Sequence, residues 1–163
     1  KLGAQVARVG LAFGMNVQAW SANLTPDRCT ECGVVCASRE ELFATSDIVT
    51  VHLVLSDRTR GLIGTTEFQM MKPTAYLVNT SRGPIIQESA LVSALQSGSI
   101  AGAGLDVYDT EPLPQNHPLR DLDNAVLTGH TGYVMRENYV TGYRGVVEDV
   151  SAWLNGEPVR LLN

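Results

Sequence analysis

Hydrophobic and polar positions follow two different periods along this chain, and the periods predict helices and strands in alternation. Apolar spacing, caps and helix-stopping residues predict helices over residues 2–13, 38–44, 65–71, 87–96 and 137–154. Short apolar runs rich in β-branched residues predict strands over residues 16–20, 33–36, 48–55, 75–78, 101–108 and 125–128. Strands that alternate with helices predict an α/β fold with a mainly parallel sheet.

Local patterns add detail to two of the predicted helices. Ser38 with Glu41 three residues later forms a capping box, which predicts the start of the helix over residues 38–44. In the last helix, Tyr139, Tyr143 and Val147 follow one another at four-residue spacing. We expect this apolar stripe to pack in the core, together with Trp153 and Leu154.

Polar side chains gather after the predicted strands rather than before them. The segments 79–82 and 106–111 each follow a strand, and His130 comes shortly after the last one. The carboxyl ends of parallel strands share one rim of the sheet, where ligands bind in open α/β folds. We therefore expect these polar residues to form one site.

Three side chains on this rim suggest a division of chemical work. Arg82 can bind a carboxylate through two parallel hydrogen bonds and polarise a neighbouring carbonyl. His130 can give or take a proton near neutral pH, and Glu111 can hold its imidazole in one tautomer. Each residue alone also has an ordinary structural interpretation, so the hypothesis of carbonyl reduction by a hydride donor depends on the combination.

Composition limits the class of protein. The 163 residues are 44% hydrophobic and 18% charged, which is typical of a soluble domain with a substantial core. A net charge of −5 without a basic cluster argues against a nucleic-acid surface. The sequence shows neither a membrane-spanning run nor a signal peptide. Three cysteines without a disulfide pattern fit a reducing compartment, so we expect a cytoplasmic protein.

Three motifs carry a resemblance that covers essentially the whole chain. The segments 79–83 (NTSRG), 104–112 (GLDVYDTEP) and 128–132 (TGHTG) resemble the D-isomer-specific 2-hydroxyacid dehydrogenase family. This resemblance implies a Rossmann-like, doubly wound parallel sheet and an NAD(P)-dependent oxidoreductase. It implies hydride transfer between NAD(P) and a small 2-hydroxy acid or 2-keto acid. Arg82 would bind the substrate carboxylate and carbonyl, His130 would move the proton, and Glu111 would pair with His130.

The resemblance also implies a set of coenzyme contacts. Gly3 would be the last glycine of a phosphate-binding motif, and Leu53 would line the coenzyme cleft. The backbone of Lys1 and Leu2 would face the pyrophosphate. On the nicotinamide side, the implied residues are Thr80, Ser81, Arg82, Asp106, His130 and Gly132.

The choice between NAD and NADP stays open at this point. Ser21 stands where an acidic residue would bind the adenine ribose of NAD, and a serine lacks the charge that repels a 2′-phosphate. Asn23 and Arg28 lie close in the sequence and could accept such a phosphate. Ser21 and Asn23 can equally bond a free ribose, so the sequence does not decide between NAD and NADP.

The chain departs from the family pattern at two positions and covers only part of the expected architecture. Gly129 and Val54 stand where the family usually has proline, and Gly129 leaves the backbone of His130 freer. Residues 1–163 are expected to be a partial dinucleotide-binding domain, truncated at its N-terminus. The segment 135–163 would pack toward a separate substrate domain. A first strand would lie between the strands predicted at 16–20 and 48–55, and without it the chain is expected to be unstable and inactive.

Two further classes of protein with this fold are alternatives to a 2-hydroxyacid dehydrogenase. Formate dehydrogenases of the same superfamily have glutamine where Glu111 stands. Dinucleotide-sensing corepressors of this fold carry long disordered tails, whereas this chain ends soon after its last predicted helix, as a natural C-terminus without a regulatory domain would. That ending also argues against the longer phosphoglycerate dehydrogenases. Family members are usually dimers, which implies a homodimer through residues 98–104 and 110–124.

The histidines and cysteines outside the three motifs are expected to have structural roles. His52 lies in an apolar strand and is expected in the core or in the wall of a cleft. His117 precedes a proline in a loop and is predicted to be solvated. The cysteines at 29, 32 and 36 are closely spaced but have no fourth ligand nearby, so no metal is expected.

Overall fold

The structure, a computed structural model, describes residues 2–161 and divides into two compact units. The first unit is Lys1–Gly129 and the second is His130–Asn163. Every strand of the described residues belongs to the first unit, and the second is built around one long helix. Each unit is described by itself below.

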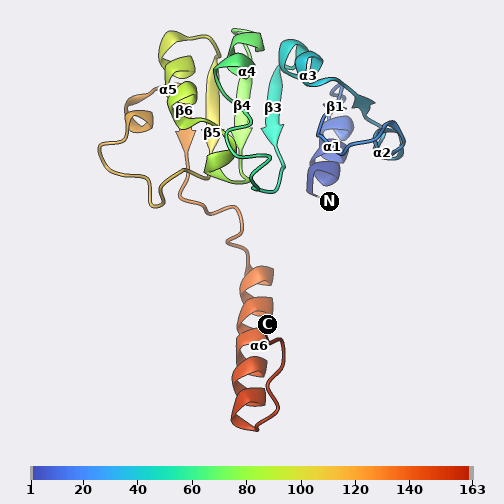
Figure 1. The fold of residues 1–163 in the computed structure, drawn as a ribbon, viewed down its shortest axis with the longest axis vertical. Coiled ribbons are helices and arrows are strands. Elements are labelled where there is room, and N and C mark those ends of the chain that lie inside the picture. Colours follow the sequence, from blue (N-terminus) through green and yellow to red (C-terminus); the bar gives the residue numbers. More distant parts are fainter. Residues whose placement is uncertain (1, 162–163) are drawn as a thin grey trace. The chain divides into compact units, whose positions relative to one another are not determined.

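The first unit alternates helices with strands, as the hydrophobic pattern predicts (Figure 1). Its elements are α1 (Leu2–Ala12), β1 (Gln18–Ala19), α2 (Pro26–Cys32), β2 (Val35–Cys36), α3 (Arg39–Thr45), β3 (Ile48–Val51), α4 (Thr65–Met70), β4 (Tyr76–Asn79), the 3₁₀ helix η1 (Gly83–Ile85), α5 (Glu88–Ser97), β5 (Gly102–Leu105), the 3₁₀ helix η2 (Pro118–Asp121) and β6 (Ala125–Leu127). The second unit contains α6 (Arg136–Leu154).

The strands form two parallel sheets. One sheet has the order β3-β4-β5-β6, and the other pairs β1 with β2. Within the described residues β1 makes no ladder with β3, and the break lies where the resemblance predicts a further strand. The α/β class with a parallel sheet, predicted from the sequence, is confirmed.

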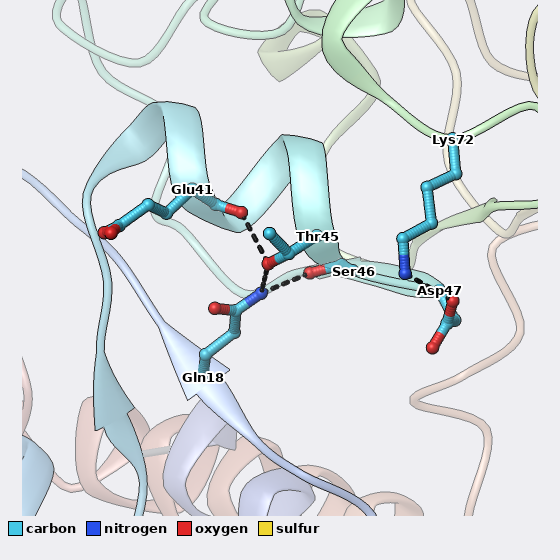
Figure 2. A network of polar contacts seen from close by, with 6 residues as sticks. All are labelled: Gln18, Glu41, Thr45, Ser46, Asp47 and Lys72. Atoms are coloured by element: carbon cyan, nitrogen blue, oxygen red, sulfur yellow. Dashed lines mark hydrogen bonds and ion pairs between the residues drawn. The ribbon is translucent and has the colours of Figure 1, made fainter.

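A side-chain network connects the two sheets at this break (Figure 2). The amide Nε2 of Gln18 in β1 donates to the hydroxyl oxygens of Thr45 and Ser46, at 2.8 and 3.0 Å. Thr45 ends α3 and Ser46 precedes β3, so the amide spans the space between β1 and β3. Near it, Lys72 Nζ pairs with Asp47 Oδ1 at 2.7 Å.

The core of the first unit lies between one face of the larger sheet and the helices α4 and α5. Leu77 of β4 is fully buried, and Ala90, Leu91, Ala94 and Leu95 form the buried face of α5, as predicted. Among the residues that alternate with the buried ones on β3 and β4, Ile48 and Tyr76 are exposed and Val78 is half-buried. The unit therefore covers one face of this sheet with its own helices.

Helix ends follow capping chemistry closely. The predicted box at α3 is confirmed, since Glu41 N donates to Ser38 Oγ at 3.1 Å and Ser38 N donates to the Glu41 carboxylate at 2.9 Å. These hydrogen bonds hold the pKa of Glu41 below its usual value. Helix α2 was not predicted, although Thr25 caps it and Gly33 ends it in a left-handed conformation.

Two predictions about apolar runs are wrong. The strand predicted over 48–55 ends at Val51, because hydrogen bonding to β4 stops there and the chain turns into a loop. The apolar residues predicted to pack in the core through the last helix are instead exposed: Tyr139, Tyr143, Val147, Trp153 and Leu154. They lie on α6, which buries none of its residues, because its unit has no second helix or sheet to cover the stripe.

None of the helices within residues 2–161 combines the length and the apolar character that crossing a membrane requires.

Candidate active site

Asn79, the last residue of β4, organises the loop that follows it. Its side chain is 1% exposed and makes two hydrogen bonds along the loop. The amide Nδ2 donates to the carbonyl of Arg82 at 3.0 Å, and Oδ1 accepts from the backbone N–H of Ser81 at 3.0 Å. Ser81 Oγ also donates to the carbonyl of Val51, at the end of β3, at 2.7 Å. The loop is therefore tied to the carboxyl ends of two neighbouring strands.

Arg82 stands at the exposed end of this loop. Its guanidinium donates through Nη1 to the carbonyl of Ser81 at 2.6 Å, while the residue remains exposed to solvent. The next residue, Gly83, lies against the backbone of Tyr108 and Asp109, so closely that a Cβ at this position would overlap their atoms. This close approach brings the Arg82 loop against the loop that follows β5.

The loop after β5 is anchored by a buried acid and a buried phenol. Asp106 is 6% exposed and its Oδ1 accepts a hydrogen bond from Thr128 Oγ1 at 2.5 Å. The hydroxyl of Tyr108 donates to the carbonyls of Leu105 and Thr128, at 3.1 and 2.8 Å. Burial, followed by the charge of Asp106, raises the pKa of Tyr108, so the phenol remains a donor at neutral pH. These bonds connect the loop to the ends of β5 and β6.

Glu111 lies on the same loop, five residues after Asp106. Its carboxylate accepts a hydrogen bond from the backbone N–H of Tyr108 at 3.0 Å, and the peptide bond to Pro112 is cis. The Glu111 side chain is exposed to solvent. The loops that carry Arg82, Asp106 and Glu111 thus meet at the carboxyl rim of one sheet, as the sequence predicts.

The far end of this loop is held by His117, which was predicted to be solvated. That prediction is wrong, because the imidazole side chain is only 14% exposed and its Nε2 lies 2.9 Å from Glu88 Oε1 on α5. Its Nδ1 accepts a hydrogen bond from the backbone N–H of Leu119 at 3.3 Å. The imidazole thus connects the loop before η2 to α5 through its two ring nitrogens.

Residues expected at the diphosphate end of the coenzyme lie near the start of α1. Leu2 and Gly3 form its first turn, and a Cβ added at Gly3 would lie 3.4 Å from the Cβ of His52, just after β3. The amino end of α1 therefore lies against the residue that follows β3. Lys1 lies outside the described residues. His52 is half-buried, as expected of a cleft wall, and burial lowers its pKa.

The remaining predicted coenzyme residues follow strand ends. Ser21 and Asn23 come after β1, and the carbonyl of Ser21 accepts from Leu24 N at 3.1 Å. Leu53 comes after β3, and Thr80 after β4. Every described coenzyme candidate of the first unit therefore lies after a strand or in the first turn of α1, the positions where open α/β domains bind dinucleotides.

His130 and Gly132 belong to the second unit and are described with it. The backbone of His130 is left-handed, with φ of 55°, a conformation that non-glycine residues adopt uncommonly. The imidazole meets the ring of Tyr133 edge-on, with the ring centroids 5.6 Å apart. A Cβ at Gly129 would meet no atom within 4 Å, so the proline usual in the family would not be crowded out by neighbouring atoms.

One cluster beside the Ser21 segment escaped the sequence analysis. The Arg39 guanidinium lies 5.7 Å from the centre of the Trp20 ring, and its Nη2 pairs with Glu67 Oε1 at 2.7 Å. Glu67 is 5% exposed, and its other oxygen accepts from Gly64 N at 2.7 Å. The sequence does not reveal this cluster, because Arg39 is 19 positions from Trp20 and 28 positions from Glu67. Trp20, the neighbour of Ser21, thus lies against an arginine of α3 that is itself paired with a buried acid of α4.

The described residues contain no group of three or more histidine, cysteine or acidic side chains arranged to hold a metal ion. The arrangement that they do contain is a parallel α/β sheet with its polar loops on the carboxyl rim and a glycine in the first turn of α1. This combination defines a dinucleotide-binding domain of the dehydrogenase class.

Comparison with known families supports the same class. The family model described as "D-isomer specific 2-hydroxyacid dehydrogenase, NAD binding domain" matches residues 1–132. The chain belongs to this family. The cofactor of such a domain is a nicotinamide dinucleotide.

Individual relatives agree with this membership. A glyoxylate reductase of Aeropyrum pernix is 42% identical over 164 residues, which cover 100% of this chain and 49% of that protein. A D-3-phosphoglycerate dehydrogenase of Archaeoglobus fulgidus is 38% identical over 98% of this chain and 30% of its own length. The crystal structure of a putative D-3-phosphoglycerate dehydrogenase from Ralstonia solanacearum matches 99% of this chain and 48% of its own chain, with a TM-score of 0.92 and 39% identity. The chain thus spans half or less of the length of these relatives.

Proposed function

We propose that the full-length protein is an NAD(P)-dependent oxidoreductase that interconverts a small 2-keto acid and the corresponding D-2-hydroxy acid. The observation that carries the proposal is the contact of Gly83 with the backbone of Tyr108 and Asp109, which joins the Arg82 loop to the Glu111 loop. This contact lies on the carboxyl rim of a domain whose family binds NAD. Glyoxylate reductase and phosphoglycerate dehydrogenase, the activities of the relatives, belong to this reaction class.

The first unit fits a dinucleotide at the start of α1. With only a glycine between the first turn of α1 and His52, the backbone N–H groups of that turn stand beside the end of β3, where they can bind a diphosphate. Leu53, Thr80, Ser81 and the carboxylate of Asp106 would line the path toward the nicotinamide. The bound coenzyme supplies the hydride that the protein itself cannot supply.

We assign the substrate end of the site to Arg82, Glu111 and His130. Arg82 is exposed at the rim, and the two edges of its guanidinium suit the carboxylate and the neighbouring carbonyl of a 2-keto acid. His130 would donate the proton that the carbonyl oxygen takes up during reduction, and would accept it during oxidation. Glu111 would hold the imidazole by accepting the hydrogen bond of its second nitrogen.

The adenosine end leaves both coenzymes possible. Ser21 has a hydroxyl where a carboxylate would repel a 2′-phosphate. Arg28, the nearest basic residue along the chain, pairs with Glu31 at 3.2 Å on the exposed surface of α2. An exposed pair of this kind is weak, so Arg28 can exchange Glu31 for a phosphate at small cost. We propose that the protein accepts NADH and NADPH.

Three further assignments follow the family resemblance. We propose that residues 135–163 pack toward a substrate domain, that the protein is a homodimer through residues 98–104 and 110–124, and that it acts in the cytoplasm. Light scattering of the full-length protein tests the dimer. A mass equal to that of one subunit at micromolar concentration would refute it.

The activity is tested with purified full-length protein and a panel of 2-keto acids. The oxidation of NADH and NADPH is followed at 340 nm with glyoxylate, hydroxypyruvate and pyruvate in turn, and with formate and NAD as a separate reaction. Turnover of at least one keto acid supports the proposal, and the product from hydroxypyruvate or pyruvate, which is chiral, is expected to be the D-hydroxy acid. Coenzyme binding without turnover of any of them would favour a dinucleotide sensor, and turnover of formate would favour a formate dehydrogenase.

A further inference from the structure

The three cysteines of the chain lie on α2 and on β2, the strand that follows it. Cys29 and Cys32 lie one turn apart on this helix, and Cys36 lies in β2. Gly33 adopts a left-handed conformation and Val34 N donates to the carbonyl of Cys29 at 3.0 Å. This helix-ending turn folds the chain back along α2. All three cysteines are free thiols.

The three thiols differ sharply in their access to solvent. Cys29 is 2% exposed, Cys32 is half-buried and Cys36 is exposed on β2. The pKa of the Cys29 thiol is raised to about 11, first by burial, then by its side-chain interaction with Cys36 and by the charges of Cys36 and Cys32. A buried thiol of this kind is unreactive by itself, whereas an exposed thiol can meet an oxidant.

We propose that Cys36 and Cys29 form an oxidisable dithiol, in which the exposed Cys36 reacts first with a hydroperoxide and the buried Cys29 then closes a disulfide bond. The inference concerns a modification site at the end of α2 and is independent of the proposed reductase activity. The turn at Gly33, closed by the hydrogen bond from Val34 N to the carbonyl of Cys29, places Cys29 and Cys36 on adjoining elements.

The chemistry balances in two steps. The Cys36 thiolate attacks one oxygen of the hydroperoxide, the O–O bond breaks, and the other oxygen leaves with a proton as water or an alcohol. Cys36 is then a sulfenic acid. The Cys29 sulfur next attacks the Cys36 sulfur, the S–O bond breaks, and hydroxide leaves with the Cys29 proton as water. Two thiols have lost two electrons, and the hydroperoxide has gained them.

The first step prepares the second one. Oxidation of Cys36 turns its sulfur into an electrophile that a second thiol can attack. The turn at Gly33 holds the two cysteines on adjoining elements, and the resulting high effective concentration of the two sulfur atoms compensates for a small thiolate fraction. Cys29 can therefore act as the resolving thiol, although it is inert toward oxidants in solution.

The test uses the reduced full-length protein, treated with hydrogen peroxide at neutral pH and then alkylated. Trypsin releases all three cysteines in one peptide, residues 29–39, because cleavage follows Arg28 and Arg39. Further cleavage after Glu31 separates Cys29 from the other two, unless a disulfide bond joins the fragments. Mass spectrometry of these fragments identifies the bond.

Matched variants assign the roles of the three thiols. Wild type and Cys32→Ser are expected to form the bond between Cys29 and Cys36. Cys36→Ser, a change at an exposed site, is expected to slow the loss of the Cys29 thiol at least tenfold. Cys29→Ala is expected to stop at a sulfenic acid on Cys36 that dimedone traps, with circular dichroism as the check of its fold.

Three results would overturn the proposal. They are a wild-type protein whose thiols survive peroxide, a bond that joins Cys32 to Cys36 in place of Cys29, and oxidation of Cys29 at an unchanged rate in Cys36→Ser. Because none of these measurements depends on coenzyme turnover, they remain decisive whether or not the protein is a reductase.

Discussion

The backbone N–H of Tyr108 donates to the carboxylate of Glu111, with 3.0 Å between N and Oε1. The same tyrosine anchors its loop through two hydrogen bonds from its hydroxyl, to the ends of β5 and β6. Glu111 is therefore an exposed acid whose direction is set by a buried neighbour. This is what a residue that positions a catalytic imidazole requires.

The proposed role of Glu111 is tested by Glu111→Gln in the full-length protein. Glutamine keeps an oxygen for the Tyr108 N–H but loses the charge, so we expect kcat/KM for the keto acid to fall by roughly 10- to 100-fold. The dissociation constant of the coenzyme, measured by fluorescence titration, is expected to stay within about twofold. The matched control is Asp109→Asn on the same loop, which should retain wild-type kcat/KM. Equal losses in both variants would mean that Glu111 only supports the loop.

The contact between the two site loops predicts a large effect of a single methyl group. In Gly83→Ala the new Cβ would overlap the backbone of Tyr108 and Asp109, so one loop has to move. We expect a loss of about 2–4 kcal/mol in the free energy of unfolding, measured with urea on the full-length protein. The control is Gly145→Ala in α6, where a Cβ meets nothing within 4 Å. Alanine there should be neutral or stabilising by up to about 1 kcal/mol.

Asp109 predicts a pH dependence of stability. Burial, followed by the charge of Glu88, raises its pKa, while Arg60 and His117 act in the opposite direction. The folded state therefore holds the proton of Asp109 more tightly than the unfolded chain, whose value is near 3.8. Ionisation then costs stability, which is lost as the pH rises through the raised pKa.

Asp109→Asn removes this cost. The variant is expected to match wild type in free energy of unfolding below pH 3.8 and to become the more stable protein as the pH rises toward 7. Urea unfolding at a series of pH values measures the difference. A variant that is less stable at pH 7 would show that the ionised Asp109 makes a net favourable interaction.

Coenzyme choice is tested at Ser21. The change Ser21→Asp places a negative charge where the 2′-phosphate of NADPH is expected. The new carboxylate can still accept a hydrogen bond from the ribose hydroxyl of NADH. We expect the ratio of kcat/KM for NADPH to that for NADH to fall about tenfold or more, a change of about 1.4 kcal/mol. Ser21→Asn is the uncharged control and should shift the ratio much less. An unchanged ratio in Ser21→Asp would place the adenosine ribose elsewhere.

Much of the fold could be predicted because its helices and strands bury one face each, and a buried face is visible in the sequence as regularly spaced apolar residues. The apolar face of α5 and the capping box of α3 are local signals, and both are confirmed. Helix α2 has seven residues and a single buried one, Cys29, so hydrophobic spacing does not reveal it. The signals that would have found it are Thr25 before Pro26 and the glycine at its end.

The residue types of the candidate site could be predicted from the sequence. The hydrogen bonds that hold those residues in place were harder to predict. Asn79 is visible as a polar residue after a strand, but its bonds to Ser81 and Arg82 depend on the fold of the loop. His117 was misjudged because its partner, Glu88, is 29 positions away. The stripe on α6 was expected in the core because a helical period says that a face is apolar, but not what covers it.

The most direct measurement compares full-length wild type with His130→Ala in the reduction of glyoxylate by NADH or NADPH. Without the imidazole the carbonyl oxygen has no positioned proton donor, so we expect kcat to fall by about 10²- to 10⁴-fold. Coenzyme binding is measured on the same preparations and should be nearly unchanged. A variant that binds coenzyme and keeps wild-type turnover would contradict the assignment of His130 and, with it, the proposed mechanism.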